Sequence, residues 1–412
     1  MFNLVDEPDR HTVRDKEAIG VRTDCEQIQM EMYERGIERS RRLPVSFEEW
    51  EDEARKILAS GPFDYVAGAA GAGDTLKANL EAFQRVRIIP RICTDISKRD
   101  LSVQLFGRTY PYPFLLAPIG VNSIVHREAE VIPAKVAAKL GIPYILSNVS
   151  TVPMEKVAEV MGDAVRWFQL YPPNDPELTK SFLQRAEAAG FSAVVVTVDS
   201  TLLGWREKDL RNGFLPFLHG EGLGNYFTDP VFRRKLQVPI EEDQREACRI
   251  ALAEGNNTCF TWRDLEKIRS LTKLPLLIKG LTHPDDAIIA MEHGVDGLIV
   301  SNHGGRQLDG AVATLEMLPV IVERIAGRIP VLMDSGIRRG ADIIKALALG
   351  ANAVLVGRPY IYGLAVAGEI GVREVLEHLI AQTELQLAIA GRSSVRQLDR
   401  SVVIDSSKAR LL

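Results

Sequence analysis

Short apolar runs alternate with amphipathic stretches over much of the chain. The apolar runs are Phe114–Ala117, Tyr144–Leu146, Trp167–Leu170, Ala193–Val198, Leu276–Ile278, Leu298–Val300, Val331–Met333 and Ala353–Val356. Between most of them, apolar residues recur with helical spacing, as in Glu128–Leu140, Asp175–Ala189, Asp285–His293 and Asp342–Leu349. Eight strands alternating with helices predict an α/β fold, a closed (β/α)8 TIM barrel. An open doubly wound sheet alternates in the same way, but no strand here leads into a GxGxxG motif.

The alternation is interrupted once, after the fourth predicted strand. Residues 203–260 carry no steady period and mix apolar pieces with the charged piece Glu241–Glu246. A long insertion in a compact domain is usually a functional lid or a disordered segment. We therefore expect residues 203–260 to form a lid or an interface element within one barrel domain of residues 46–412.

The first 45 residues precede the barrel pattern and form a separate N-terminal extension. Apolar residues between Gln27 and Arg41 predict a short helix there, whereas the residues up to about 24 are charged and aperiodic. Ser46 stands three residues before Glu49, which predicts a capping box and a helix to Leu58.

Composition narrows the class of protein further. The 412 residues are 46% hydrophobic and 25% charged, as in an ordinary globular protein, and the net charge of -5 gives no electrostatic reason to expect nucleic-acid binding. The four cysteines show neither CxxC nor metal-type spacing, which favours a reducing cytoplasm and no metal site. At the N-terminus, charged residues stand where a signal peptide would have its apolar core. The sequence has no apolar run of 18 residues, so we expect no membrane span.

Polar residues and glycines follow nearly every predicted strand. In a barrel, the residues after the strands converge on one mouth. They are Ala117-Pro118-Ile119-Gly120, Ser147-Asn148, Gln169-Leu170-Tyr171, Thr197-Val198-Asp199, Lys279-Gly280, Ser301-Asn302-His303, Asp334-Ser335-Gly336 and Gly357-Arg358. Structural turns would not need Gln, Lys, His, Asp and Arg together at one face. This mouth is therefore the predicted active site.

The sixth strand end carries the clearest catalytic signal. His303 can exchange a proton near neutral pH, and Arg306 offers a charged planar fork to a carboxylate. Taken alone, the His and Arg pair would be equally typical of a satisfied loop histidine and a surface arginine. Tyr65 taken alone is more typical of a buried aromatic residue whose hydroxyl is paired. The other strand ends favour the catalytic interpretation.

Two of the strand ends suggest binding of a phosphate group, and four others suggest binding of a flat ring. A helix is predicted to open after the seventh strand at Asp334 to Gly340, which includes Arg338, and another after the eighth strand at Gly357-Arg358. The helix starts after these two strands are where this fold usually binds phosphate. Lys279 could form a Schiff base or act as a fixed charge beside a cofactor. The set of Gln, Thr, Ser and Lys suits hydrogen bonds to a heterocycle with several carbonyls and ring nitrogens. These features together indicate FMN.

With these residues in view, the chain resembles the family of FMN-dependent 2-hydroxy acid oxidases and dehydrogenases. The signature Ser301-Asn-His-Gly-Gly-Arg-Gln307 matches directly, and the resemblance covers about residues 47–392. Within the family the chain looks similar to the lactate 2-monooxygenase type, on Ala117–Gly120, Gly204–Arg206, Phe214–Leu218 and Asn225–Phe232. Glu207, Asn212 and Gly213 look more like lactate oxidase.

The resemblance implies roles for individual residues. Arg206 and Arg306 would bind a substrate carboxylate, Tyr65 and Tyr171 would hold substrate oxygens, and His303 would be the base that Asp199 supports. Lys279 would lie beside the flavin. The implied FMN-binding residues are Ala117, Pro118, Ile119, Gly120, Ser147, Gln169, Thr197, Lys279, Ser301, Asp334, Gly336, Arg338, Gly357 and Arg358.

The resemblance also implies partners. They are an L-2-hydroxy acid, with L-lactate favoured, molecular oxygen as acceptor, and further copies of the chain in a tetramer or octamer. Gly120 stands where plain oxidases carry Ala, and with the insertion it predicts oxygen-coupled decarboxylation of the keto acid. A simple oxidase or a dehydrogenase is the alternative.

Two hypotheses from other classes stay open at this point. One is a barrel lyase without flavin that uses Lys279 as a Schiff base. The other is a catalytically silent barrel that serves as a binding module.

Overall fold

The barrel predicted from the sequence is present. The computed structural model describes residues 24–37 and 43–407. Eight parallel strands hydrogen-bond in the order β4 to β11, and β11 pairs with β4 to close the barrel. The strands are β4 (Phe114–Leu116), β5 (Tyr144–Ser147), β6 (Arg166–Leu170), β7 (Val194–Thr197), β8 (Leu276–Leu281), β9 (Gly297–Val300), β10 (Val331–Met333) and β11 (Ala353–Val356). This confirms the (β/α)8 class.

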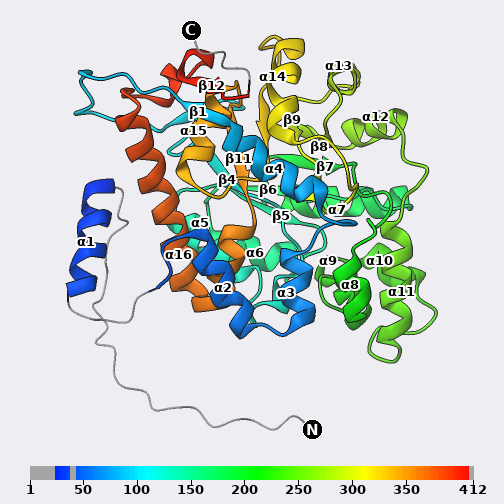
Figure 1. The fold of residues 1–412 in the computed structure, drawn as a ribbon. Helices are drawn as coiled ribbons and strands as arrows, with labels where there is room; N and C mark the ends of the chain where they lie inside the picture. The colour runs from blue at the N-terminus through cyan, green and yellow to red at the C-terminus, as the bar shows by residue number, and fades with distance from the viewer. Residues whose placement is uncertain (1–23, 38–42, 408–412) are drawn as a thin grey trace.

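Helices follow the strands in sequence and surround the barrel (Figure 1). They are α5 (Val131–Leu140), α6 (Met154–Met161), α7 (Pro176–Ala188), α12 (Trp262–Leu271), α13 (Pro284–Glu292), α14 (Thr314–Ile325), α15 (Gly340–Ala348) and α16 (Arg358–Ile389). The four helices predicted from periodicity are all present, with ends shifted by a few residues. Because each helix returns the chain to the start of the next strand, all the strand ends with polar residues point to the same mouth.

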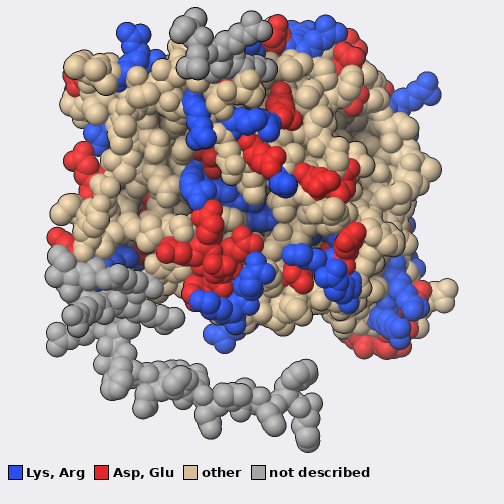
Figure 2. Space-filling view, viewed as in Figure 1, with Lys and Arg blue, Asp and Glu red and all other residues tan. Residues whose placement is uncertain are grey.

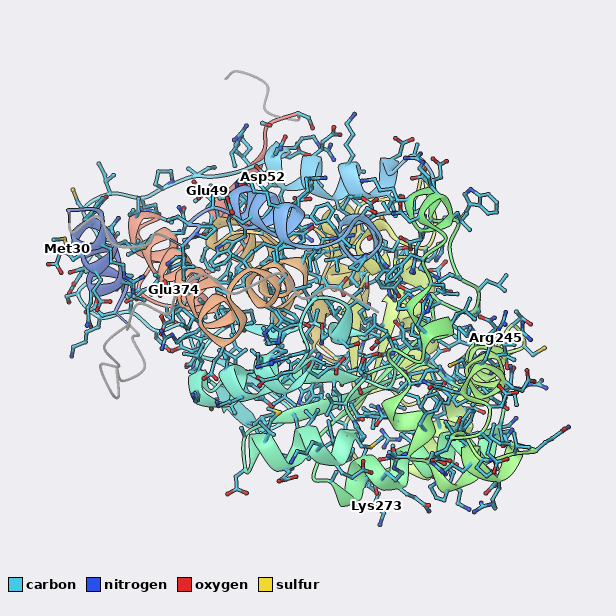
Figure 3. The ribbon with its side chains drawn as sticks, turned by 90° about the horizontal axis from the view of Figure 1, so that it is seen from below. Met30, Glu49, Asp52, Arg245, Lys273 and Glu374 are labelled. Atoms are coloured by element: carbon cyan, nitrogen blue, oxygen red, sulfur yellow. The ribbon has the colours of Figure 1, made fainter. Side chains whose placement is uncertain are left out.

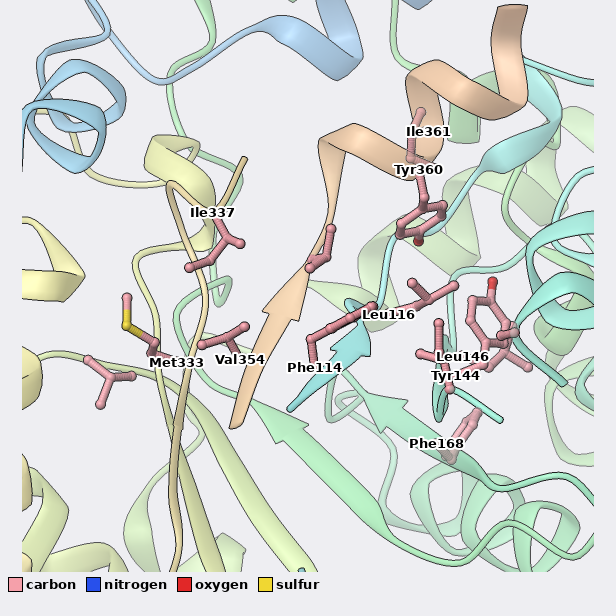
Figure 4. Packing of buried hydrophobic residues seen from close by; sticks show 14 of the residues in the cluster. Phe114, Leu116, Tyr144, Leu146, Phe168, Met333, Ile337, Val354, Tyr360 and Ile361 are labelled. Carbon is pink, nitrogen blue, oxygen red and sulfur yellow. The ribbon is translucent and has the colours of Figure 1, made fainter. Parts of the chain in front are cut away.

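The core has two layers because strand side chains alternate between the faces of the sheet. Leu115 points into the barrel and packs with Ile145 and Trp167, whereas Phe114 and Leu116 pack against the helices. Figure 4 shows this outer layer, where side chains of β4, β5 and β11 meet those of α16. Both layers are closed to water, which gives the mouth a rigid base.

Short antiparallel pairs were not predicted. The hairpin of β2 (Val103–Leu105) and β3 (Arg108–Tyr110) adds Leu105 and Tyr110 to the inner layer of the core. Before the barrel begins, α4 (Asp74–Arg85) leads into β1 (Val86–Ile88), which pairs with β12 (Val403–Asp405) from the other end of the fold. The single turns η4 (Val395–Gln397) and η5 (Arg400–Val402) precede β12. Strands of three residues are too short to show a period of two.

In the part of the chain that the structure describes, the barrel is preceded by the helices α1 (Cys25–Ile37), α2 (Phe47–Ile57), α3 (Ser60–Ala67) and α4 (Asp74–Arg85). The predicted capping box of Ser46 and Glu49 starts α2. The predicted helix from Gln27 to Arg41 corresponds to α1, and its last positions, like residues 1–23, lie outside the described residues. Figure 3 shows α1, marked by Met30, at one edge of the molecule beside α16, marked by Glu374.

The insertion is more regular than its aperiodic sequence indicates. It contains α8 (Glu207–Asn212), η2 (Pro216–His219), α9 (Gly224–Phe227), α10 (Pro230–Lys235) and α11 (Gln244–Gly255). Asp229 and Asp243 cap α10 and α11. Each helix is short and faces a different partner, so no common period runs through the segment. Asn225 and Asp229 are fully buried, which fixes the middle of the insertion on the barrel.

The surface carries both charge signs. In Figure 2, acidic side chains gather over α2 and basic side chains lie directly beside them. None of the described helices has the length and apolar character needed to cross a bilayer.

Candidate active site

The polar strand ends surround one cavity of about 370 Å³. This volume lies within the range of about 300–1,000 Å³ that is usual for small-molecule sites. Its walls come from the loops after β4, β7, β9, β10 and β11, from α3, and from the insertion. The predicted residues that line it are Tyr65, Ala117, Pro118, Ile119, Gly120, Tyr171, Arg206, Lys279, His303, Arg306, Asp334, Gly336, Arg338, Gly357 and Arg358.

His303 and Asp199 form a hydrogen-bonded pair at this cavity. Nδ1 of His303 lies 2.8 Å from Oδ1 of Asp199. Since a carboxylate only accepts hydrogen bonds, Nδ1 carries the proton and Nε2 is the basic atom. Nε2 lies 3.3 Å from the hydroxyl of Tyr171. Burial raises the pKa of Tyr171, which keeps that hydroxyl neutral.

The protonation states of the pair suit a base and its support. Burial opposes ionisation of Asp199, but His303 and Lys279 outweigh it and lower the pKa of this carboxyl to about 2. Burial also lowers the pKa of His303 below its ordinary value, although Asp199 acts in the other direction. At neutral pH the carboxylate is therefore ionised and the imidazole is ready to accept a proton.

A sharp turn presents His303 to the cavity. His303, Gly304 and Gly305 all have positive φ, at 59°, 66° and 77°. This conformation is uncommon for a residue with a side chain and costs free energy unless the surroundings hold it. Asn302 holds the turn, because its Oδ1 accepts the N–H of Gly305 and its amide exchanges hydrogen bonds with that of Asn79 on α4.

Two arginines flank the ring of Tyr65. The guanidinium carbon of Arg306 lies 4.8 Å from the ring centroid and that of Arg206 lies 5.8 Å from it. Arg306 donates to the carbonyls of Tyr65 and Gly68 at the end of α3. Burial and the charge of Arg206 lower the pKa of Arg306 to about 9. Arg306 is still charged at neutral pH, and a bound anion would relieve the repulsion between the two guanidinium groups.

Lys279 is held as a cation. Its Nζ lies 3.1 Å from Oγ of Ser301 and 3.3 Å from Oδ2 of Asp334. Burial disfavours the ammonium, but Asp334 and Asp199 outweigh it and raise the pKa of Lys279. Lys279 is thus a fixed positive charge in the floor of the cavity.

Several buried polar atoms at this mouth have no hydrogen-bond partner among the described residues. They include Nε2 of Gln169, Oγ1 of Thr197 and Nε of Arg338. Burying a polar group without a partner is costly, so such groups mark places where a ligand supplies the missing hydrogen bonds.

Comparisons with known proteins agree with this geometry. The sequence model of the FMN-dependent dehydrogenase family matches residues 54–405. The chain belongs to the FMN-dependent dehydrogenase family.

Its relatives act on 2-hydroxy acids by name. An L-lactate oxidase of Lysinibacillus sphaericus (strain C3-41) is 44% identical over 356 residues, 86% of this chain and 92% of that protein. A peroxisomal (S)-2-hydroxyacid oxidase of Arabidopsis thaliana is 39% identical over 87% of this chain and 96% of the plant protein. A crystal structure of mandelate oxidase with (S)-4-hydroxymandelic acid superposes with a TM-score of 0.76 at 39% identity, covering 86% of this chain and 97% of the other. The chain is accordingly an FMN-dependent 2-hydroxy acid oxidoreductase.

The cavity fits the FMN on which this family depends. The unpartnered groups of Gln169, Thr197 and Arg338 suit a ring with carbonyls and nitrogens and a phosphate. Burial and the neighbouring Arg338 lower the pKa of Arg358 to about 10, so both arginines carry a charge that a phosphate would balance. The side chains of Gln169 and Thr197 are buried, and neither residue is part of the cavity wall.

Three predicted residues act one step away from the cavity. Ser147 donates to Oε1 of Gln169 at 2.6 Å and so orients its amide. Ser301 contacts Lys279 and accepts the N–H of His303 at 3.1 Å. Asp199 contacts the cavity through His303. None of these three side chains is part of the cavity wall.

Two serines of the site were not assigned a role from the sequence. Oγ of Ser200 lies 2.9 Å from Oδ1 of Asp199 and 3.2 Å from Nδ1 of His303. Oγ of Ser335 accepts the N–H of Gly304 at 3.0 Å. Ser200 directly follows the strand-end residue Asp199, so extending that strand end by one position would have included it. Ser335 lies within the predicted strand end Asp334-Ser335-Gly336 but was not assigned a role.

The loop that carries Gly120 is packed tightly against the loop after β5. A methyl group at Gly120 would overlap the carbonyl oxygen of Val149 and lie 2.7 Å from its Cγ2. The N–H of Val121 donates to the same carbonyl at 3.0 Å. Glu130, which is fully buried, accepts N–H groups from both loops, at Asn122 and Val152. Gly120 therefore has a packing reason of its own, separate from any effect on oxygen.

Proposed function

We propose that this enzyme oxidises an L-2-hydroxy acid with a small apolar side chain, L-lactate in the first place, to the 2-keto acid with oxygen as the acceptor. The observation that carries the proposal is the meeting of His303–Asp199 with Arg206 and Arg306 at one cavity. The insertion covers this cavity with apolar residues such as Leu203, Leu215 and Phe217, which favours a substrate with an apolar side chain. Two relatives are named L-lactate oxidase.

The substrate carboxylate is bound by Arg206 and Arg306. Arg206 is buried and Arg306 is half-buried, and both guanidinium groups lie beside the ring of Tyr65, so little water competes with the substrate for them. Charge-assisted hydrogen bonds of this kind are about twice as strong as neutral ones. The hydroxyls of Tyr65 and Tyr171 orient the substrate oxygens.

His303 removes a proton from the bound substrate at Nε2. Asp199 keeps the proton of Nδ1 in place and stabilises the imidazolium that forms, the same relation as in a His–Asp pair of a hydrolase. The bound flavin supplies the two-electron acceptor. Lys279 provides a fixed positive charge in the floor of the cavity, which would stabilise the negative charge that develops when the flavin accepts electrons.

The two other classes considered lose their support. A Schiff-base lysine must give up its proton, whereas Asp334 and Asp199 raise the pKa of Lys279. A silent barrel would not need the His303–Asp199 pair.

Oxygen-coupled decarboxylation stays a prediction. Oxidation of L-lactate by O₂ gives pyruvate and hydrogen peroxide, and reaction of these two within the site would give acetate, CO₂ and water. One of its two grounds is Gly120, for which the packing against Val149 gives a second explanation. The other is the insertion, which covers the cavity and could retain pyruvate. A homo-oligomer and a cytoplasmic location likewise stay predictions.

The test is anaerobic reduction of the purified enzyme with L-lactate, L-mandelate and glycolate, followed by oxygen and product analysis. Bleaching of the flavin by L-lactate is the expected result. Free pyruvate and hydrogen peroxide in equal amounts would identify an oxidase, and acetate with CO₂ the decarboxylating type. Failure of all three acids to reduce the flavin would overturn the proposed function.

A further inference from the structure

Gln307 joins the catalytic loop after β9 to the segment of residues 199–206, which begins at the end of β7 and runs into the insertion. Its Oε1 accepts from Nη2 of Arg206 at 2.9 Å and from the N–H of Gly204 at 3.4 Å. Its Nε2 donates to the carbonyls of Asp199 at 2.9 Å and Leu202 at 2.8 Å. Both ends of this one amide therefore bind the same segment.

We propose that Gln307 is a positioning residue for the substrate carboxylate and that it acts through Arg206. The inference rests on the proposed function, because it assigns the carboxylate to Arg206. Oε1 of Gln307 accepts from Nη2 of the guanidinium, and the carbonyl of Arg306 accepts its Nε–H at 3.1 Å. Arg206 is thereby held with its Nη1 turned to neither of these acceptors, and the carboxylate of Asp209 lies 4.0 Å from that nitrogen, beyond hydrogen-bond distance.

The neighbouring backbone supports this role. A side chain at Gly204 would overlap the carbonyl of Arg306 and lie 2.8 Å from Cα of Gln307. The two segments thus touch backbone to backbone, and the Gln307 amide lies at the point of contact. In contrast, the side chain of the next residue, Leu308, is 69% exposed, so Leu308→Ala is a matched control in the same loop.

The amide is also the appropriate chemical group. A carboxylate of the same length could bind Arg206, but its charge would compete with that of the substrate. It would also place a second oxygen against the carbonyls of Asp199 and Leu202, which accept hydrogen bonds and cannot donate them. A neutral amide satisfies all four partners and leaves the charge of Arg206 for the ligand.

The first experiment measures binding of pyruvate to the FMN-loaded enzyme from the change in flavin absorbance. Losing one hydrogen bond to a charged group typically changes an equilibrium by about tenfold or more. Gln307→Leu should raise the Kd for pyruvate by about this factor, and Gln307→Glu by at least as much, whereas Leu308→Ala should leave it unchanged. Equal Kd values for Gln307→Leu and Leu308→Ala would overturn the proposal.

A double-mutant cycle separates positioning from general damage. In an Arg206→Met background, Gln307→Leu should have little further effect on the Kd for pyruvate, because the group through which it acts is gone. An undiminished effect in that background would mean that Gln307 does not act through Arg206, and would sink the inference even if its substitution weakens binding.

A second measurement needs no substrate. Hydrogen exchange of the backbone amides in residues 200–206 should be faster in Gln307→Leu than in Leu308→Ala, since the N–H of Gly204 loses its acceptor. Unchanged exchange would exclude the anchoring role. Because this result does not depend on L-lactate being a substrate, failure of the proposed function and failure of this inference can be told apart.

Discussion

At the scale of single residues, the protonation of His303 is set by two opposing effects. Burial lowers its pKa and Asp199 raises it, with burial the larger. A base must be neutral, so kcat/KM for the hydroxy acid should be constant above this lowered pKa and fall about tenfold per pH unit below it.

Asp199→Asn removes the group that raises the pKa of His303, so the acid limb of the kcat/KM profile should move to lower pH. The plateau value of kcat/KM at higher pH should fall by about 10²-fold or more, because the imidazolium of His303 is no longer stabilised by a carboxylate. An acid limb that moves to higher pH in this variant would contradict the assignment.

The arginines should separate into two functional pairs. Arg206→Met and Arg306→Met should weaken pyruvate binding with FMN retained, whereas Arg338→Met and Arg358→Met should release FMN. Removing one partner of a buried charge pair typically costs about 2–5 kcal/mol. Flavin content after ultrafiltration and the Kd for pyruvate measure the two effects. Arg306 and Arg358 also bind carbonyls at the end of α3, so these two variants should melt at lower temperature as well. Flavin loss confined to the Arg206 and Arg306 variants would reverse the division.

Residues that follow a strand directly could be predicted from the sequence, but their long-range partners could not. The barrel rule places every strand end at one mouth, and this located His303, Arg306 and Lys279. Asn79 and Asn302 are 223 positions apart and meet only in the folded chain. An isolated Asn in a helix and another in a loop carry no sign of each other. The same holds for the amide of Gln307, which stands in the recognised signature but whose partners lie in residues 199–206, about 100 positions earlier in the chain.

At the scale of elements, the loop after β4 explains Gly120. Gly120→Ala would force the methyl group against the carbonyl of Val149. Overpacking of this kind typically costs about 1–3 kcal/mol, so the FMN-loaded variant should melt at lower temperature and bind FMN more weakly. Thermal unfolding and the Kd for FMN are the measurements. An unchanged melting temperature combined with a changed rate of reoxidation by oxygen would restore the view that Gly120 acts on oxygen.

Elements with a regular period were predictable and those without one were not. The barrel strands are buried apolar runs, and the helices between them show one apolar face, so both leave a clear pattern. The insertion is built from short helices that contact different parts of the barrel: the amide of Asn225 donates to the carbonyl of Asn148, and the amide of Asn174 donates to the carbonyl of Ala253. No single face is repeated, and the sequence therefore indicated an irregular segment.

At the scale of the whole molecule, the N-terminal extension should contribute stability and not catalysis. Cys25 and Ile28 of α1 are buried against Ala381 of α16, and Arg35 lies 3.0 Å from Glu374. None of the residues of α1 lines the cavity. In α16, Ile361 is the last residue that lines it. In Figure 3, α1 and the insertion, marked by Arg245, lie at opposite edges of the molecule. The family match also begins only at residue 54.

Deletion of residues 1–42 should therefore leave FMN content and the rate of flavin reduction by the hydroxy acid unchanged. Burying one large apolar side chain contributes about 1.5–3 kcal/mol, so loss of α1 should lower the free energy of unfolding by about 3 kcal/mol. Ile28→Ala in the full chain tests the same contact without a truncation, and it should account for much of this loss, because large-to-small changes in a core cost about 2–5 kcal/mol. Thermal unfolding of the FMN-loaded enzyme measures both. A deleted chain that melts normally but reduces its flavin slowly would place the extension in the active site, against the geometry of the cavity.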